Sequence, residues 1–169
     1  MWVNQCSNKG SVSLESAGGI QFYAGGIIGD MANSVSVRQS VNRGSVEAEF
    51  CAGGLVGRMS GSNGAVTSNY NTGDVLANSY AGGLIGVMTG ASGGSQVSCC
   101  YNIGDVNLNI SGKCIGALFG AMLDGTYTNL TALKNPANAS LPLVGLLNGS
   151  ASTGEYLEAD KMKTESFLN

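Results

Sequence analysis

Near-copies of one six-residue motif recur along most of the chain and constrain its fold more than any other feature. The motif is AGGLVG at Ala52–Gly57, and it returns at Ala24–Gly29, at Ala81–Gly86 and, weakened to IGALFG, at Ile115–Gly120. A second marker, Asn-x-Gly-x-Val, precedes each copy. Two markers that share a period of about 30 residues are typical of a repeat array, in which each unit buries its apolar face against its neighbours.

The residues between the motifs predict short strands rather than helices. Segments such as VSVRQSV (Val35–Val41) and SQVSCCY (Ser95–Tyr101) alternate β-branched and small polar residues, and clusters of Gly, Asn and Ser separate them. We expect about three strands per repeat, so that each repeat forms one coil of a parallel β-solenoid. Because parallel crossovers are nearly always right-handed, we predict an all-β, right-handed solenoid of four to five coils.

We divide the chain into repeats at residues 1–125 and a different C-terminal part at residues 126–169. The four repeats span about 2–37, 38–67, 68–97 and 98–125. In the last part, LPLVGLLNG (Leu141–Gly149) is interpreted as a degenerate fifth coil, and Glu158–Leu168 as a short helix that caps the solenoid. The start has no evident cap, so we expect the chain to be a fragment of a larger protein, with further coils or another domain before Trp2.

Equivalent side chains should form ladders because equivalent strands of successive coils lie about 4.8 Å apart. One ladder would be made of amides that bond to one another at a turn, and the glycine two residues later would supply a positive φ. The Val of the marker would point inward, and each Gly pair would let the backbone bend or pack closely. The predicted structural residues are Asn8, Asn42, Asn71, Asn102, Gly25, Gly26, Gly53, Gly54, Gly82 and Gly83.

At these residues the sequence resembles the GLUG-motif repeat family of bacterial surface proteins, named for Gly-Leu-hydrophobic-Gly. GLVG at Gly54–Gly57 and GLIG at Gly83–Gly86 match the motif outright, whereas GIIG at Gly26–Gly29 and ALFG at Ala117–Gly120 each differ by one residue. The resemblance implies a secreted or cell-surface bacterial protein, often modular, with adhesin-like or peptidase-associated roles. In that family the repeats are accessory modules, so the resemblance provides no catalytic residue.

Composition excludes several other classes. Gly accounts for 27 of 169 residues and Pro for only 2, while apolar residues reach 43%, which excludes collagen and argues against disorder. A net charge of -3 with eight Lys and Arg leaves no basic patch for nucleic acid. No apolar run is long enough to cross a bilayer, so we expect no membrane insertion.

The candidate chemical sites are few, and we predict no cofactor. Asp74 and Asp105 share one position in adjacent coils, where their carboxylates either are solvated or hold a calcium ion. The sequence contains no His and no CxxC, so the five cysteines are interpreted as reduced, mostly buried side chains. Cys99 and Cys100 should point to opposite faces of a strand.

Aromatic residues offer the other possible surface. Tyr70 and Tyr101 align in neighbouring coils. Tyr23 and Tyr80 share a second position, which Cys51 and Cys114 fill in the other coils. Such rings either bind sugars or only cover the coils beside them. The insertions Ser13–Tyr23 and Asn107–Lys113, which interrupt the regular coil, are a further place for a binding surface.

The sequence therefore predicts a non-catalytic structural or adhesive module outside the cell, a rigid stalk or binding scaffold. Its partners would be a host glycan or extracellular-matrix protein, together with other domains of the parent protein. The alternative is an accessory or carbohydrate-processing β-helix of a secreted enzyme. Acidic residues are scarce in the middle repeats, which disfavours hydrolysis because general acid–base catalysis needs a positioned pair.

Overall fold

The protein is all-β. The computed structural model describes residues 1–15, 21–89, 95–110, 114–123, 126–133, 138–148, 150–151 and 154–157. Within these ranges every strand pair is parallel, and none of the residues forms a helix that could cross a membrane. The helix predicted at residues 158–168 lies outside the described residues.

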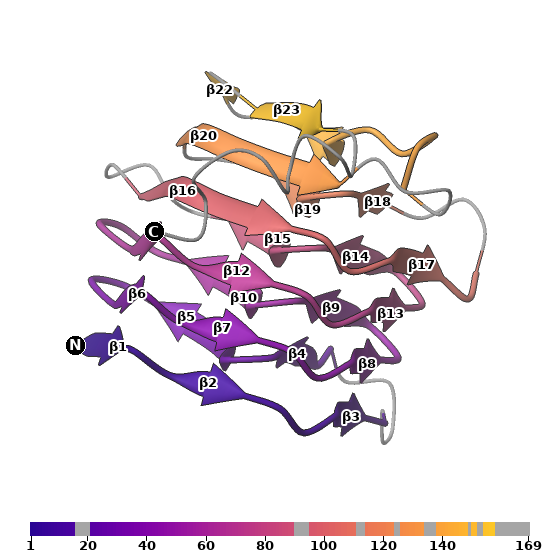
Figure 1. The fold of residues 1–169 in the computed structure, drawn as a ribbon, viewed down its shortest axis with the longest axis horizontal. Coiled ribbons are helices and arrows are strands. Elements are labelled where there is room, and N and C mark those ends of the chain that lie inside the picture. Colours follow the sequence, from indigo (N-terminus) through magenta and orange to yellow (C-terminus); the bar gives the residue numbers. More distant parts are fainter. Residues whose placement is uncertain are drawn as a thin grey trace.

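Equivalent strands of successive repeats pair to form four sheets, which we name A to D (Figure 1). Sheet A contains β1 (Trp2–Asn4), β2 (Ser7–Asn8), β6 (Ser36–Arg38), β7 (Val41–Asn42), β11 (Ala65–Thr67), β12 (Tyr70–Asn71), β16 (Gln96–Asn102), β20 (Thr126–Leu133), β22 (Ser150–Ala151) and β23 (Gly154–Leu157). Sheet B contains β3 (Val12–Leu14), β8 (Val46–Ala48), β13 (Val75–Ala77) and β17 (Val106–Leu108).

The other two sheets contain the two sides of the glycine motif. Sheet C contains β4 (Tyr23–Gly25), β9 (Cys51–Gly53), β14 (Tyr80–Gly82) and β18 (Cys114–Gly116). Sheet D contains β5 (Ile28–Ala32), β10 (Val56–Ser60), β15 (Ile85–Thr89), β19 (Phe119–Met122) and β21 (Val144–Leu147). The two residues between them, such as Gly54 and Leu55, form the corner that the motif encodes.

A central repeat contains five short strands, so the prediction of about three was wrong. One extra break falls in sheet A, where two residues separate the first two strands in each of the first three repeats. The first of the two has a positive φ, at Gln5, Gln39 and Ser68, with values of 54°, 49° and 58°. In the fourth repeat the equivalent Cys99 has a φ of 52° but lies within the continuous strand β16. Another break falls at the glycine motif, whose corner separates a strand of sheet C from a strand of sheet D.

The glycines of the Asn-x-Gly marker do not have the positive φ that the sequence analysis predicted. Among the described glycines only Gly61 has one. At Gly44, Gly73 and Gly104 an added Cβ would instead overlap the carbonyl oxygen of the equivalent glycine one repeat earlier. Glycine is needed there because the backbones of successive repeats approach closely, not because the turn is left-handed.

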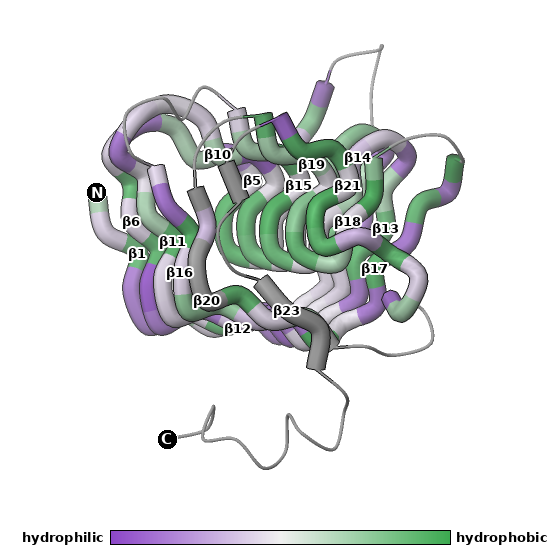
Figure 2. The backbone as a smooth tube through the Cα atoms, turned by 90° about the horizontal axis from the view of Figure 1, so that it is seen from above, coloured by the Kyte–Doolittle hydropathy of each residue, from purple (hydrophilic) through white to green (hydrophobic). Residues whose placement is uncertain are grey.

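The core is a set of apolar ladders that run along the stack. The two apolar residues of the glycine motif are fully buried from the second repeat onward, as at Leu55, Val56 and Phe119. Val46, Val75 and Val106 form a second buried column with the Ala residues of sheet C, which confirms that the Val of the marker points inward. Figure 2 shows the apolar turns as one stacked column in the middle of the cross-section.

At the C-terminal end of the stack the four sheets do not all end at the same level. At the C-terminal end β20 extends sheet A, and β21, within the segment interpreted as a degenerate coil, extends sheet D. Sheet B ends at β17, where Oδ1 of Asn138 accepts a hydrogen bond from the backbone N–H of Val106 at 3.0 Å. In the preceding repeats a backbone carbonyl occupies that place, so the buried Asn138 amide substitutes for the next strand.

Candidate functional site

The predicted Asn ladder is continuous through the stack. Nδ2 of Asn8, Asn42 and Asn71 each donates to Oδ1 of the next Asn at 2.8 Å. Nδ2 of Asn102 ends the ladder by donating to the carbonyl of Ala117 at 3.1 Å. Each amide also bonds to the glycine two residues later, so it holds its own turn and the next repeat together.

The glycine pairs lie where the ladder meets the corner between sheets C and D. A Cβ on Gly26, Gly54 or Gly83 would overlap the Asn side chain of the following repeat. A Cβ on Gly25, Gly53 or Gly82 would overlap the carbonyl oxygen three residues later in the same corner. The Asn-x-Gly marker and the glycine pair therefore belong to one contact, which explains why they share a period. These residues hold the scaffold together and leave no room for a ligand.

A second polar ladder, which the sequence analysis missed, connects the positive-φ corner of sheet A. It is formed by Cys6, Ser40, Asn69 and Cys100. The side chains of Ser40, Asn69 and Cys100 each accept a hydrogen bond from the backbone N–H of the equivalent residue one repeat earlier. Ser40 and Asn69 are buried. Because three residue types, Cys, Ser and Asn, occupy this one position, the sequence pattern does not reveal the ladder.

The two aspartates proposed for calcium lie on exposed turns. Oδ1 of Asp74 accepts a hydrogen bond from the backbone N–H of Asp105 at 3.0 Å, and at the same position Ser45 donates to Ser11. Among the described residues no three acidic, Cys or His side chains gather where a metal could bind. Calcium binding by Asp74 and Asp105 stays a prediction.

The five cysteines are all free, but they are less uniformly buried than expected. Cys51 and Cys100 are buried, Cys114 is half-buried, and Cys6 and Cys99 are exposed. Cys99 and Cys100 do face opposite sides of the sheet. Burial raises the pKa of the Cys100 thiol to about 12 and that of Cys51 further still, so both stay protonated and unreactive near neutral pH.

The Tyr70–Tyr101 pair is unsuited to stacking against a sugar. The two rings are parallel, with centroids 4.9 Å apart and an angle of 1° between their planes. The guanidinium of Arg43 lies 5.7 Å from the centroid of the Tyr70 ring and also donates to its hydroxyl at 2.9 Å. Tyr70 is therefore occupied by its neighbours, and we interpret this pair as packing between repeats.

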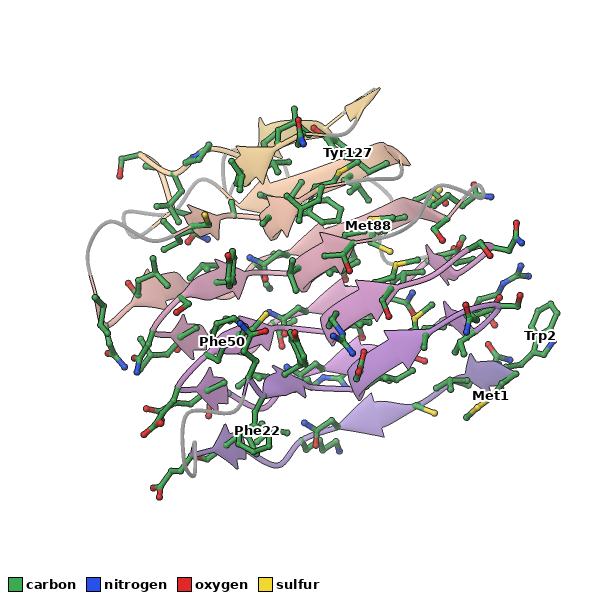
Figure 3. The ribbon with its side chains drawn as sticks, turned by 180° about the vertical axis from the view of Figure 1, so that it is seen from behind. Met1, Trp2, Phe22, Phe50, Met88 and Tyr127 are labelled. Carbon is green, nitrogen blue, oxygen red and sulfur yellow. The ribbon has the colours of Figure 1, made fainter. Side chains whose placement is uncertain are left out.

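A different aromatic surface lies where sheets C and D meet. Two adjoining hollows, of about 540 and 200 Å³, share Gln21, Tyr23 and Arg58. The first is also lined by Leu14, Phe22 and Asp30, and the second by Phe50, Tyr80, Val87, Thr89 and Leu123. We call this surface the aromatic groove. Figure 3 shows Phe22 and Phe50 on successive levels of the stack, at the opposite end of the strands from Trp2.

The rings of the aromatic groove meet edge to face. Phe50 lies between Tyr23 and Tyr80, with centroid distances of 5.9 and 5.5 Å and interplanar angles of 81° and 68°. The three rings are only half-buried, and they pack on a small cluster formed by Cys51, Val87 and Ala121. Half-buried aromatic rings at a hollow are typical of a ligand-binding surface.

One ion pair lies in the wall of the groove. Arg58 on β10 donates through Nε to Oδ1 of Asp30 on β5 at 2.9 Å, and its Nη2 pairs with Oδ2. Its Nη1 donates to the hydroxyl of Tyr23 at 3.2 Å, and the guanidinium lies 4.2 Å from the centroid of that ring. The hydrogen bond to Asp30 raises the pKa of Arg58 beyond its already high ordinary value.

The sequence analysis anticipated part of this site. Gln21, Phe22 and Tyr23 belong to the insertion Ser13–Tyr23, of which residues 16–20 lie outside the described part of the chain, as do residues 111–113 of the second insertion. Phe50 and the Arg58–Asp30 pair were missed because each residue occurs once in its ladder. No family model, curated protein or solved structure matches the chain, so its function must be argued from this geometry.

Proposed function

We propose that this chain is a non-catalytic adhesive module of a bacterial surface protein, and that the aromatic groove binds glycans. The stacked repeats form the rigid scaffold of the module, and the groove is its binding surface. The module acts outside the cell as part of a larger protein of the GLUG type. The half-buried aromatic rings at two adjoining hollows are the observation that carries this proposal.

The architecture that we propose is a right-handed parallel β-solenoid of four to five coils with a C-terminal cap. The parallel pairing of equivalent strands supports it, as does the Asn ladder that crosses four repeats. The right hand follows from the strong preference of parallel crossover connections. Such a scaffold fixes the spacing of Phe50, Arg58 and Tyr80 in the groove, because each lies on or beside a strand that pairs with both neighbours.

The carboxylate content of the groove fits a function in binding rather than in catalysis. Among the described side chains that line its two hollows, Asp30 is the one carboxylate, and both its oxygens contact Arg58. Glycosidases use two carboxyl groups on either side of the scissile bond. Sugar rings, by contrast, bind to proteins by placing their C–H faces on aromatic rings, which the groove offers in Phe50 and Tyr80.

A glycan and extracellular-matrix array, probed with the purified protein with and without calcium, tests the proposal. We expect saturable binding to oligosaccharides that Tyr80→Ala reduces by at least about tenfold, or roughly 1.4 kcal/mol. Position 80 tolerates a small residue, because Cys51 and Cys114 occupy the same position in the neighbouring repeats. Loss of glycan binding by Tyr80→Ala would therefore reflect the missing aromatic ring and not misfolding.

Tyr70→Ala is the matched control, because it removes a half-buried tyrosine from a ladder outside the groove. It should leave glycan binding unchanged. Equal loss of binding in both variants would contradict the assignment of the groove. Binding that requires calcium would shift attention to Asp74 and Asp105, and absence of binding by well-folded protein would favour a spacer without a ligand of its own.

A further inference from the structure

The charged residues of the aromatic groove indicate which class of glycan the groove binds. This inference rests on the proposed function. We propose that the groove selects uncharged oligosaccharides and that the Arg58–Asp30 pair is the specificity determinant. The pair keeps the one cation of the groove away from anionic ligands. Replacing the Asp30 carboxylate should free Arg58 and convert the groove into a site for acidic glycans.

All three nitrogens of the Arg58 guanidinium donate hydrogen bonds within the protein. Nε and Nη2 contact the two oxygens of Asp30, and Nη1 donates to the hydroxyl of Tyr23. Planar two-point pairing of this kind is the strongest form of the Arg–carboxylate interaction. An anionic sugar that approached Arg58 would have to break this arrangement and would meet the exposed carboxylate of Asp30.

The other side chains that line the two hollows carry no formal charge. Among the described residues the lining side chains therefore have no net charge, and the neighbouring hollow, which shares Leu14 with the groove, is lined by Glu15, Glu47 and Glu49. A neutral sugar loses no ion–ion attraction in this groove, whereas an acidic sugar gains none and is repelled by Asp30. Arg58 thus affects specificity through its pairing with Asp30, because its charge is not available to a ligand.

Arg58 also determines which rings remain for the ligand. Its guanidinium lies over Tyr23, which occupies that ring with a cation–π contact. Phe50 and Tyr80 are left to receive sugar rings. Gln21 and Thr89, which line the same hollow, provide polar groups for hydroxyls. Aromatic faces with hydroxyl-binding groups at their edges suit a neutral pyranose rather than a carboxylated or sulfated one.

The test measures binding of the full chain to matched neutral and carboxylated oligosaccharides at low and high salt. The wild type should bind neutral glycans with affinity that salt hardly changes, because no net charge is involved. Asp30→Asn should gain at least about tenfold in affinity for the carboxylated glycans, and added salt should reverse that gain. Asp74→Asn, measured in calcium-free buffer, removes the same charge from a turn outside the groove and should change neither affinity.

The possible failures are distinguishable. Tighter wild-type binding to acidic glycans, or an Asp30→Asn variant without the gain, would overturn the specificity inference and leave glycan binding intact. No binding to any glycan class would overturn the proposed function as well. Thermal unfolding of Asp30→Asn is measured in parallel, since one exposed ion pair contributes little to stability and the variant should fold.

Discussion

The first repeat and the third contain the same marker, yet the structure gives their residues different environments. Val75 is fully buried and Asn71 is inaccessible, whereas Val12 and Asn8 at the start of the stack remain half-exposed. Asn71 has an amide neighbour on both sides, and Asn8 has one. The difference shows that a repeat acquires its stability from the repeats on either side of it.

The largest expected contrast is at the glycine of the marker. Gly73→Ala places a methyl group onto the carbonyl of Gly44, whereas at Gly10 the nearest atom to an added Cβ is Oδ1 of Asn8 at 3.8 Å. Gly73→Ala should lower the free energy of unfolding by about 4 kcal/mol or more, and Gly10→Ala by about 0.5 kcal/mol or less. Chemical denaturation measures both, and equal losses would contradict the close backbone approach.

The next contrast is at the Asn ladder. Asn71→Ala removes one hydrogen bond from each of the buried Asn42 and Asn102 amides, and it removes the two bonds that Asn71 makes to the backbone of Gly73. We expect a loss of about 3 kcal/mol in unfolding free energy. Asn8→Ala should cost about 1 kcal/mol or less, because water replaces the missing bonds at the edge. If Asn8→Ala proved as costly as Asn71→Ala, the first repeat would be as tightly held as the interior.

The smallest contrast concerns pH and the ladder that contains Cys6 and Cys100. Burial raises the Cys100 pKa from 9.0 to about 12, so above pH 9 the unfolded chain loses a proton that the folded chain keeps. Stability is therefore complete below pH 9 and decreases as pH rises toward 12, by about 1.4 kcal/mol per pH unit for this thiol. Cys100→Ser, which copies Ser40 in the same ladder, should make the pH dependence of thermal unfolding shallower.

Exposed Cys6 supplies the control for that experiment. Cys6→Ser makes the same chemical change at an exposed position of the same ladder, so it is compared with Cys100→Ser under identical conditions. An equal effect of the two substitutions would mean that Cys100 is not protected by burial. Thiol labelling of the native protein gives an independent measure, with Cys6 and Cys99 expected to react before Cys51 and Cys100.

Much of the fold could be predicted because the repeat itself encodes it. The shared period of the markers gave the parallel stacking, and the alternation in each marker gave the inward Val. Other features could not be predicted because the same letters permit two physical roles. Glycine in Asn-x-Gly served close approach at Gly44 and Gly73 and not a positive φ, while Gln39 and Ser68 adopted the positive φ.

The sequence by itself determined the repeat, the positions that enter the core and the Asn ladder, because stacking multiplies each of these contacts along the chain. Only the tertiary structure decided what happens at positions that occur once. Asp30 and Arg58 are paired neighbours in sheet D, Phe50 lies beside sheet C, and the groove forms where the two sheets adjoin. The repeat pattern in the sequence reveals the positions that recur in every repeat, whereas the binding surface depends on contacts between residues that each occur in one repeat.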